Sequence, residues 1–323
     1  MNEAAKVLFL DDEPGILDAL RRLFIDDHVV VLTSTHGTDA LDKLEKNEIS
    51  VLVSDNLMPC MKGIEFLQRA RHLSPDTVRI MLTGHADMEA AVDAINKGEV
   101  YRFITKPWDD NELRMTVLHS IDRYGTVRAL READEHSLYS IGQTIELKDH
   151  YTKGHCDRVA KYASAIAETI GIEKGLREDI KRGSWLHDCG KIGVPEAILN
   201  LTGPLTGEQR SIVRNHPAWG AEVARLAHLS DAIVNVILYH HERFDGKGYP
   251  AGLKGEGIPL EARVVHVADI YDALTSDRAY RGRMTRDEAV KTLMGNRGTC
   301  SDPRIVDAFV SLLGGIHGRD AGN

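Results

Sequence analysis

The sequence predicts two domains, a doubly wound α/β domain with a five-stranded parallel sheet and then an all-α domain. Up to about residue 120, short β-branched apolar runs alternate with stretches of helical periodicity, which indicates a parallel sheet wrapped by helices. From residue 141 onward this alternation stops. Amphipathic helical patterns dominate there, as in Val159, Ala163, Ile166 and Ile170.

Three segments organise the chain. We expect the α/β domain at residues 1–122, a long charged helix at 109–140 and the all-α domain at 141–323. Apolar residues recur every three or four positions along the helix, from Leu113 to Leu130. This pattern fits either a linker helix packed on one domain or a coiled coil that joins two protomers.

Composition and charge exclude several classes of protein. No apolar run reaches the roughly 18 residues of a membrane span, and the N-terminal apolar run is short, so we expect a cytoplasmic protein without signal peptide or membrane insertion. A formal charge of -9 disfavours extensive nucleic-acid binding, which needs many phosphates neutralised. The cysteines form no CxxC pair and fit reduced thiols: Cys60, Cys156, Cys189 and Cys300.

Polar residues stand at the carboxyl ends of the predicted strands, where open α/β sheets bind ligands. Asp11 and Asp12 follow the first strand, Asp55 the third, Thr83 the fourth and Lys106 the fifth. Three gathered carboxylates suit Mg²⁺. Asp55 then becomes a phosphoryl acceptor, with Lys106 pairing with the phosphate and Thr83 donating a hydrogen bond to it. A single strand-end aspartate more often caps a helix, so the prediction depends on the joint placement.

These positions resemble the receiver domain of two-component response regulators over roughly residues 5–122. The matching runs are LDDEP, SDNLMPCMKG, MLTGHAD and FITKPW. The resemblance implies a flavodoxin-like fold, phosphotransfer from a sensor histidine kinase to Asp55, and a switch made by Thr83 and Phe103. Phe103 is equally well explained as a core residue.

A second set of polar residues falls on separate predicted helices of the C-terminal half. Histidine and carboxylate without thiolate favour catalytic iron, manganese, nickel or zinc over a structural zinc site. A lone inward histidine is usually a core residue, but a carboxylate that interrupts the apolar run VVHVADIYDAL needs a cation. The set comprises His155, His187, Asp188, His216, His240, His241 and Asp269.

Such a cluster can hold two divalent metals that share Asp188, with a bridging hydroxide as nucleophile. The reaction that suits it is phosphodiester hydrolysis. Lys191, close after the His187–Asp188 pair, would stabilise the transition state.

The runs HDCGKIGVPEAIL and HHERFDGKGYP resemble the HD-GYP family of metal-dependent phosphohydrolases, from about residue 140 to 315. The resemblance implies hydrolysis of cyclic di-GMP to pGpG, and often onward to GMP. It assigns all seven residues above as metal ligands and Lys191 as the catalytic lysine. Arg278 and Arg281 match basic residues that contact substrate phosphates, although surface ion pairing would also explain them. Tyr249 belongs to the triplet Gly248, Tyr249 and Pro250, from which the family takes its name. This triplet is either a plain turn or a loop that shapes the substrate or partner surface.

One departure from the family pattern affects the number of metals. Some members carry a glutamate four residues before the first ligand histidine, which supports a third metal, and here Tyr151 stands at that position. We therefore expect two metals. Glu146 lies nearby as an alternative ligand, but its spacing does not match.

Three activities remain open from the sequence. The first is a cyclic di-GMP phosphodiesterase controlled by phosphorylation of Asp55 through the helix at 109–140. The second is a catalytically weak module that binds cyclic di-GMP, and the third is a phosphohydrolase for another nucleotide. A DNA-binding output is disfavoured because no helix-turn-helix tail and no basic stretch follows residue 150.

Overall fold

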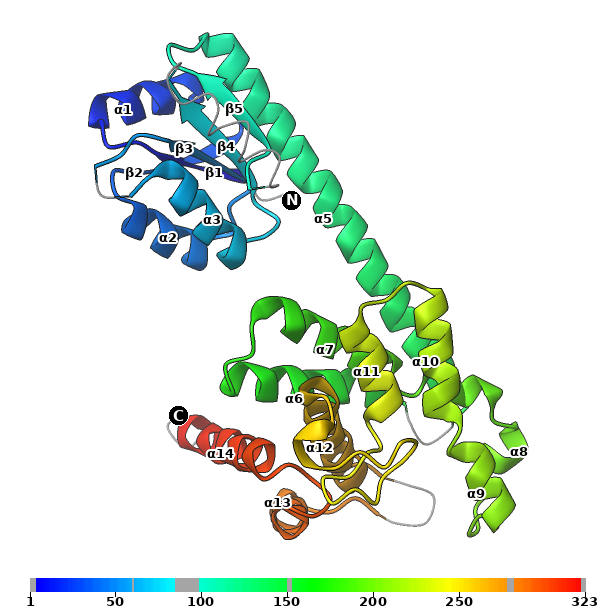
Figure 1. The fold of residues 1–323 in the computed structure, drawn as a ribbon. Helices are drawn as coiled ribbons and strands as arrows, with labels where there is room; N and C mark the ends of the chain where they lie inside the picture. Colours follow the sequence, from blue (N-terminus) through cyan, green and yellow to red (C-terminus); the bar gives the residue numbers. More distant parts are fainter. Residues whose placement is uncertain (1–3, 60, 85–98, 150–152, 278–281, 321–323) are drawn as a thin grey trace. The chain divides into compact units, whose positions relative to one another are not determined.

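The computed structural model describes residues 4–59, 61–84, 99–149, 153–277 and 282–320 (Figure 1). The chain divides into two compact units, Met1–Ala133 and Asp134–Asn323. The predicted fold class, an α/β domain followed by an all-α domain, is confirmed.

A five-stranded sheet forms the centre of the N-terminal unit, in the order β2-β1-β3-β4-β5. Every neighbouring pair is parallel. The central strand β3 is buried along its whole length, which explains why it begins with three apolar residues, Val51, Leu52 and Val53. The strands are β1 (Ala5–Leu10), β2 (Val29–Ser34), β3 (Val51–Asp55), β4 (Val78–Thr83) and β5 (Arg102–Thr105).

Helices cover both faces of the sheet. On one face, Leu17 and Phe24 from the α1 segment and Val117 from α5 pack against Val7 and Val53. On the other, α2 and α3 pack against the alternate strand residues, such as Leu8 and Leu52. This division follows from the two-residue period of a strand. The helices are α1 (Pro14–Leu23), α2 (Gly37–Lys46), α3 (Gly63–Leu73) and α5 (Asp110–Glu146).

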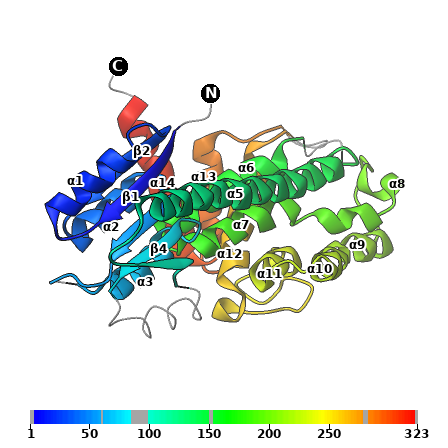
Figure 2. The same ribbon diagram turned by 90° about the horizontal axis from the view of Figure 1, so that it is seen from above.

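The helix predicted at 109–140 is α5, which is one unbroken helix in Figure 2. It continues to Glu146, past the predicted end, because Ile141 and Ile145 extend the helical repeat and Ile145 is buried. Near its middle the apolar side chains are open to solvent, with Val127 39% and Leu130 64% exposed.

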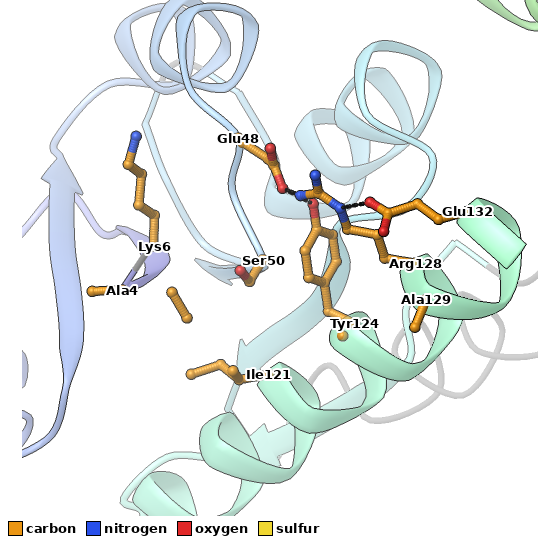
Figure 3. Close-up of a pocket in the computed structure, with 11 residues that line it drawn as sticks. Ala4, Lys6, Glu48, Ser50, Ile121, Tyr124, Arg128, Ala129 and Glu132 are labelled. Carbon is orange, nitrogen blue, oxygen red and sulfur yellow. Dashed lines mark hydrogen bonds and ion pairs between the residues drawn. The ribbon is translucent and has the colours of Figure 1, made fainter. Parts of the chain in front are cut away.

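Polar contacts fasten α5 to the amino-terminal edge of the sheet within the first unit. Arg128 forms ion pairs with Glu48 and Glu132, and the Tyr124 hydroxyl donates to Glu48 over 3.0 Å (Figure 3). These residues line a cavity of about 460 Å³ that Lys6 also borders. The contacts attach α5 to this part of the unit two to three turns beyond its last fully buried apolar residue here, Val117.

The C-terminal unit is built around α12, which is buried on all sides from Ala262 to Ala268. Val159 of α6, Val236 of α11 and Phe309 of α14 pack with it in one cluster. The helices are α6 (His155–Thr169), α7 (Lys174–Leu186), α8 (Glu196–Leu199), α9 (Gly207–Val213), α10 (His216–Leu226), α11 (Asp231–Tyr239), α12 (Leu260–Thr275), α13 (Arg286–Asn296) and α14 (Pro303–Asp320), with short 3₁₀ turns η2 (Cys189–Gly193) and η3 (Gly255–Gly257).

Among the described residues, no helix has the length and apolar character needed to cross a membrane.

Candidate metal centre and phosphoacceptor pocket

The strand ends of the N-terminal unit bring Asp11, Asp55 and Lys106 together. The Lys106 ammonium lies 2.7 Å from an oxygen of Asp55 and 3.0 Å from an oxygen of Asp11. Burial alone would lower the pKa of Lys106, but hydrogen bonds and charge from the two aspartates outweigh it and raise that pKa. Lys106 is therefore a fixed cation beside both carboxylates.

The remaining residues predicted for this pocket lie on the same strand ends. Asp12 follows Asp11 and is half-buried, while Thr83 ends β4, is fully buried and donates to the Gly84 carbonyl over 3.3 Å. Phe103 on β5 is half-buried and packs against the core cluster that contains Met81. Its position fits the core interpretation and leaves the switch role a prediction.

The seven candidate ligands of the C-terminal unit come from helix ends and from the central helix. His155 begins α6, while His187 and Asp188 follow α7. His216 begins α10, His240 and His241 follow α11, and Asp269 lies within α12. Helix termini suit this use because a side chain there projects beyond the packed cylinder of the helix.

Asp188 lies between two groups of imidazoles. Its Oδ1 is 3.2 Å from Nε2 of His216 and 4.0 Å from Nε2 of His240, and its Oδ2 is 3.5 Å from Nε2 of His187. Two sets of possible ligand atoms, each within 4.8 Å of one another, share this aspartate: Asp188 with His216, His240 and His241, and Asp188 with His155 and His187.

Asp269 reaches the second set through His155. Its Oδ1 lies 3.4 Å from Nε2 of His155, and that nitrogen lies 3.3 Å from Nε2 of His187. The structure therefore brings all seven candidate ligands to one place.

Three of the imidazoles are oriented by the backbone. In His187, His216 and His240, Nδ1 donates to the carbonyl three residues earlier, over 2.7, 2.8 and 2.9 Å. A carbonyl only accepts, so these tautomers leave Nε2 with its lone pair toward the cluster, as a metal ligand requires. Burial lowers the pKa of His187, burial and neighbouring imidazoles lower that of His240 well below its usual range, and both rings are neutral at pH 7.

A glycine permits the close approach of two of these ligand segments. A Cβ on Gly190 would lie 1.9 Å from the His216 carbonyl oxygen. The turn that carries Asp188 therefore packs directly on the start of α10, and only glycine fits there.

Asp272 was not among the predicted site residues. Its Oδ2 accepts from Nδ1 of His155 over 2.7 Å, and Arg158 donates to its Oδ1 over 2.6 Å. Burial would raise the pKa of Asp272, but the bonds from His155 and Arg158 outweigh it and lower the pKa to about 2. Its position three residues after Asp269, on the same helix face, was a signal available in the sequence.

Asp149 was also missed. Lys191 lies 2.7 Å from Oδ2 of Asp188 and 3.1 Å from Oδ2 of Asp149. Burial opposes a charge on Lys191, yet the two aspartates outweigh it and raise the pKa of Lys191 above its ordinary value. The lysine is a largely buried cation beside the ligand Asp188.

The loop after His241 folds back onto that residue. The Tyr249 ring stacks on the His241 ring with centroids 4.7 Å apart, and the Tyr249 amide donates to the His241 carbonyl over 3.3 Å. Gly248 permits this approach, since a Cβ there would lie 2.3 Å from the backbone nitrogen of Arg243. The buried Glu242 accepts from the amides of Ala251 and Gly252 over 2.7 and 2.9 Å. The loop that contains the family's naming triplet is therefore held by these hydrogen bonds against His241, a candidate metal ligand.

Glu146 contacts the start of α6. Its carboxylate accepts from the amides of Gly154 and Cys156, both over 2.6 Å, and so caps the start of α6. Both oxygens are engaged, which makes Glu146 a support for His155. Tyr151, Arg278, Arg281 and Cys60 lie outside the described residues.

The donor set fits divalent metals. Neutral imidazoles and carboxylates converge without a thiolate, which suits a catalytic first-row metal site. Burial and the neighbouring His216 lower the pKa of His241 to about 3, so that ring is also available as a ligand at neutral pH.

Comparisons with known proteins agree with this arrangement. Residues 140–305 match the HD domain family, and residues 7–118 match the response regulator receiver domain. The chain is 32% identical to the cyclic di-GMP phosphodiesterase response regulator RpfG of Xanthomonas campestris, over 94% of this chain and 86% of that protein.

Two further matches cover about half of the chain or less. A 3'3'-cGAMP-specific phosphodiesterase of Vibrio cholerae is 32% identical over 56% of this chain and 35% of its own length. The receiver domain of an HD domain-containing protein from Pseudomonas fluorescens is 31% identical, over 40% of this chain and 95% of that one, with a TM-score of 0.38. The chain therefore belongs to the response regulators in which a receiver domain is followed by an HD domain of the HD-GYP type.

Proposed function

We propose that this chain is a metal-dependent phosphodiesterase that hydrolyses cyclic di-GMP under the control of its receiver domain. The observation that carries the proposal is Asp188, whose two oxygens face two separate imidazole groups that together match a binuclear site. Its full-length relative RpfG is named for the same activity and spans nearly the whole chain.

Divalent metals held by His155, His187, Asp188, His216, His240, His241 and Asp269 would supply Lewis acidity that activates water and offsets phosphoryl charge. Two metals fit two donor groups that share one carboxylate. Iron or manganese suits these ligands best, and nickel or zinc is the alternative.

Lys191 acts on the substrate. Held by Asp188 and Asp149, its ammonium is fixed beside the ligands and stays protonated, because those carboxylates raise its pKa. It donates to a phosphoryl oxygen as charge develops there, and stabilises the transition state without a covalent protein intermediate. Tyr249, stacked on His241, would border the substrate, and Arg278 and Arg281 would contact its phosphates.

The receiver pocket supports phosphorylation of Asp55. Asp11, Asp12 and Asp55 would hold Mg²⁺, and Lys106 would pair with the phosphoryl group, with Thr83 donating to it. The phosphoryl donor is a sensor histidine kinase. We further propose that α5, and with it Phe103 as a switch, transmits the change to the HD domain.

The proposal extends to the assembly and the location of the protein. Val127 and Leu130 are exposed apolar residues at helical spacing on α5, and support a homodimer through that helix. The loop around Tyr249 is a candidate contact for protein partners. The described cysteines Cys156, Cys189 and Cys300 are free thiols, which supports a reducing, cytoplasmic setting.

A substrate panel tests the proposal. Metal-loaded protein is incubated anaerobically with cyclic di-GMP, 3'3'-cGAMP or cyclic di-AMP, and the products are separated by chromatography. We expect cyclic di-GMP to be consumed fastest, giving pGpG and then GMP if the same site accepts the linear dinucleotide. Asp188→Asn is the inactive control. Preference for another nucleotide, or binding of cyclic di-GMP without turnover, would contradict the proposal.

A further inference from the structure

Arg214 stands at the edge of the metal centre and has no role in the scheme above. It follows the last residue of α9 and precedes the ligand His216 by two positions. Its guanidinium lies over the Tyr249 ring, 5.1 Å from the ring centroid. Such a cation–π contact orients the flat guanidinium while its in-plane N–H groups remain free to donate.

Aromatic contacts continue from Arg214 into the ligand cluster. Tyr249 stacks on His241, whose ring centroid is 4.1 Å from that of His240 and 5.1 Å from that of His216. The pKa of Tyr249 is raised, by burial first and then by the charges of Asp188 and Asp269, while Arg214 lowers it. Tyr249 is thus within electrostatic reach of both Arg214 and the metal ligands.

Arg214 differs from the other arginines near the centre. Arg158 is paired with Asp272, and Arg243 with Asp245. Within the described ranges, no carboxylate forms an ion pair with Arg214, and its side chain is exposed. A cation oriented by a ring, at the rim of an anion-processing site, is available to a ligand.

We propose that Arg214 is a substrate-contacting residue whose guanidinium donates to two adjacent acceptors of the cyclic dinucleotide. The proposal rests on the phosphodiesterase function. A guanidinium fork matches two kinds of acceptor pair on such a ligand, the oxygens of the phosphodiester that is not cleaved and the O6 and N7 atoms of guanine. Adenine offers N7 but presents a donor in place of O6, so the two sources can be separated.

The first variant is Arg214→Met, which keeps an unbranched side chain over the ring and removes the donors. We expect kcat/KM for cyclic di-GMP to fall about 10- to 100-fold, the range of one bidentate contact, with a parallel loss in the affinity measured by calorimetry. Arg225→Met is the matched control, because Arg225 is an exposed arginine in the last turn of α10, and it should leave both values unchanged.

A small substrate distinguishes the loss of a contact between Arg214 and the cyclic dinucleotide from damage to the metal centre. Bis(p-nitrophenyl) phosphate carries one phosphodiester, with no second phosphodiester and no guanine, so Arg214→Met should hydrolyse it at the wild-type rate. Equal loss on this substrate and on cyclic di-GMP would mean that Arg214 only supports the centre, and would overturn the proposal.

Comparison of cyclic di-GMP with cyclic di-AMP shows whether Arg214 donates to the base or to the phosphate. A loss on cyclic di-GMP that exceeds the loss on cyclic di-AMP at least tenfold, and that Arg214→Lys does not restore, identifies guanine. An equal loss on both, largely restored by lysine, identifies the phosphate. Unchanged kcat/KM and affinity in Arg214→Met overturn the contact while leaving the phosphodiesterase intact. Failure of the wild-type protein to bind or hydrolyse cyclic di-GMP overturns both.

Discussion

Asp272 fixes the orientation of a metal ligand without being one itself. It accepts from Nδ1 of His155 and is held in turn by Arg158. A carboxylate behind an imidazole sets its tautomer and raises its basicity as a ligand. In agreement, burial would lower the pKa of His155, but the bond that His155 donates to Asp272 and the charges of the nearby aspartates outweigh it and raise that pKa.

Replacing this carboxylate should weaken metal binding. We expect Asp272→Asn to lower metal affinity about 10- to 100-fold while the protein stays folded, since the amide retains the shape but loses the charge. Competition with a chromophoric chelator measures the affinity. Asp287→Asn, at an exposed aspartate in the first turn of α13, is the control. Equal metal retention in both variants would show that Asp272 only pairs with Arg158.

Replacing Lys191 should affect the chemical step more than substrate binding. We expect Lys191→Met to lower kcat about 100- to 1,000-fold, the usual cost of losing one transition-state donor, with a smaller change in KM. Metal content measured on the same sample is the control, because Lys191 also pairs with the ligand Asp188. A kcat close to wild type at full metal occupancy would remove Lys191 from the mechanism.

Among single residues, the sequence identified the candidate metal ligands better than the residues that contact and orient the ligands and Lys191. The ligand histidines stand in long, specific runs, so their residue types and spacing sufficed. Asp149 stands 42 residues before Lys191, and nothing in the local sequence relates the two before the helices pack. The capping role of Glu146 was missed although its partners, Gly154 and Cys156, lie close in the sequence.

At the scale of elements, α5 is attached to the sheet domain at more than one point along its length. Arg114 donates to both oxygens of Asp27, over 2.9 and 2.6 Å, and joins α5 to the segment between α1 and β2. The helix period predicted α5 and its apolar face. Its end was predicted too early, although Ile141 and Ile145 continue the helical repeat close to Glu146.

The Asp27–Arg114 pair should contribute stability that depends on pH. The hydrogen bond from Arg114 lowers the pKa of Asp27 below its ordinary value of 3.8. A lowered folded-state pKa means that the contribution is complete above 3.8 and is lost as the pH falls through the folded pKa. Asp27→Asn should therefore lower the urea midpoint of the N-terminal unit at pH 7, with the difference from wild type vanishing at the acid end.

Hydrogen exchange in β1 peptides, read as a function of urea, measures that midpoint. Asp18→Asn, which removes an exposed ion pair with Arg21, is the control and should change little. A difference between Asp27→Asn and wild type that persists unchanged below the ordinary pKa would contradict the assignment.

For the whole molecule, the two-domain order and the fold of each domain were predictable. The alternation of strands and helices ends where the histidine-bearing helices begin, and each half carries its own specific runs. The attachment of α5 to the first unit depends on tertiary contacts such as Arg128 with Glu48, which periodicity does not encode.

Control by the receiver gives a prediction at this scale. Acetyl phosphate should change the turnover of cyclic di-GMP by the wild-type protein severalfold and leave Asp55→Asn unaffected. Arg128→Ala should keep phosphorylation but reduce the response, because α5 loses its ion pair with Glu48. Mass spectrometry verifies the modification. Equal turnover with and without verified phosphorylation of Asp55 would contradict control through this pocket.

The most direct test of a binuclear phosphodiesterase is a metal titration of turnover. Protein freed of metal by chelation receives ferrous or manganous ion in steps under anaerobic conditions, and hydrolysis of cyclic di-GMP is measured at each step. We predict no turnover without metal and a maximum at two equivalents per chain, with Asp188→Asn inactive throughout. Full activity in the chelated protein, or no hydrolysis at any loading despite binding of cyclic di-GMP, would contradict the account.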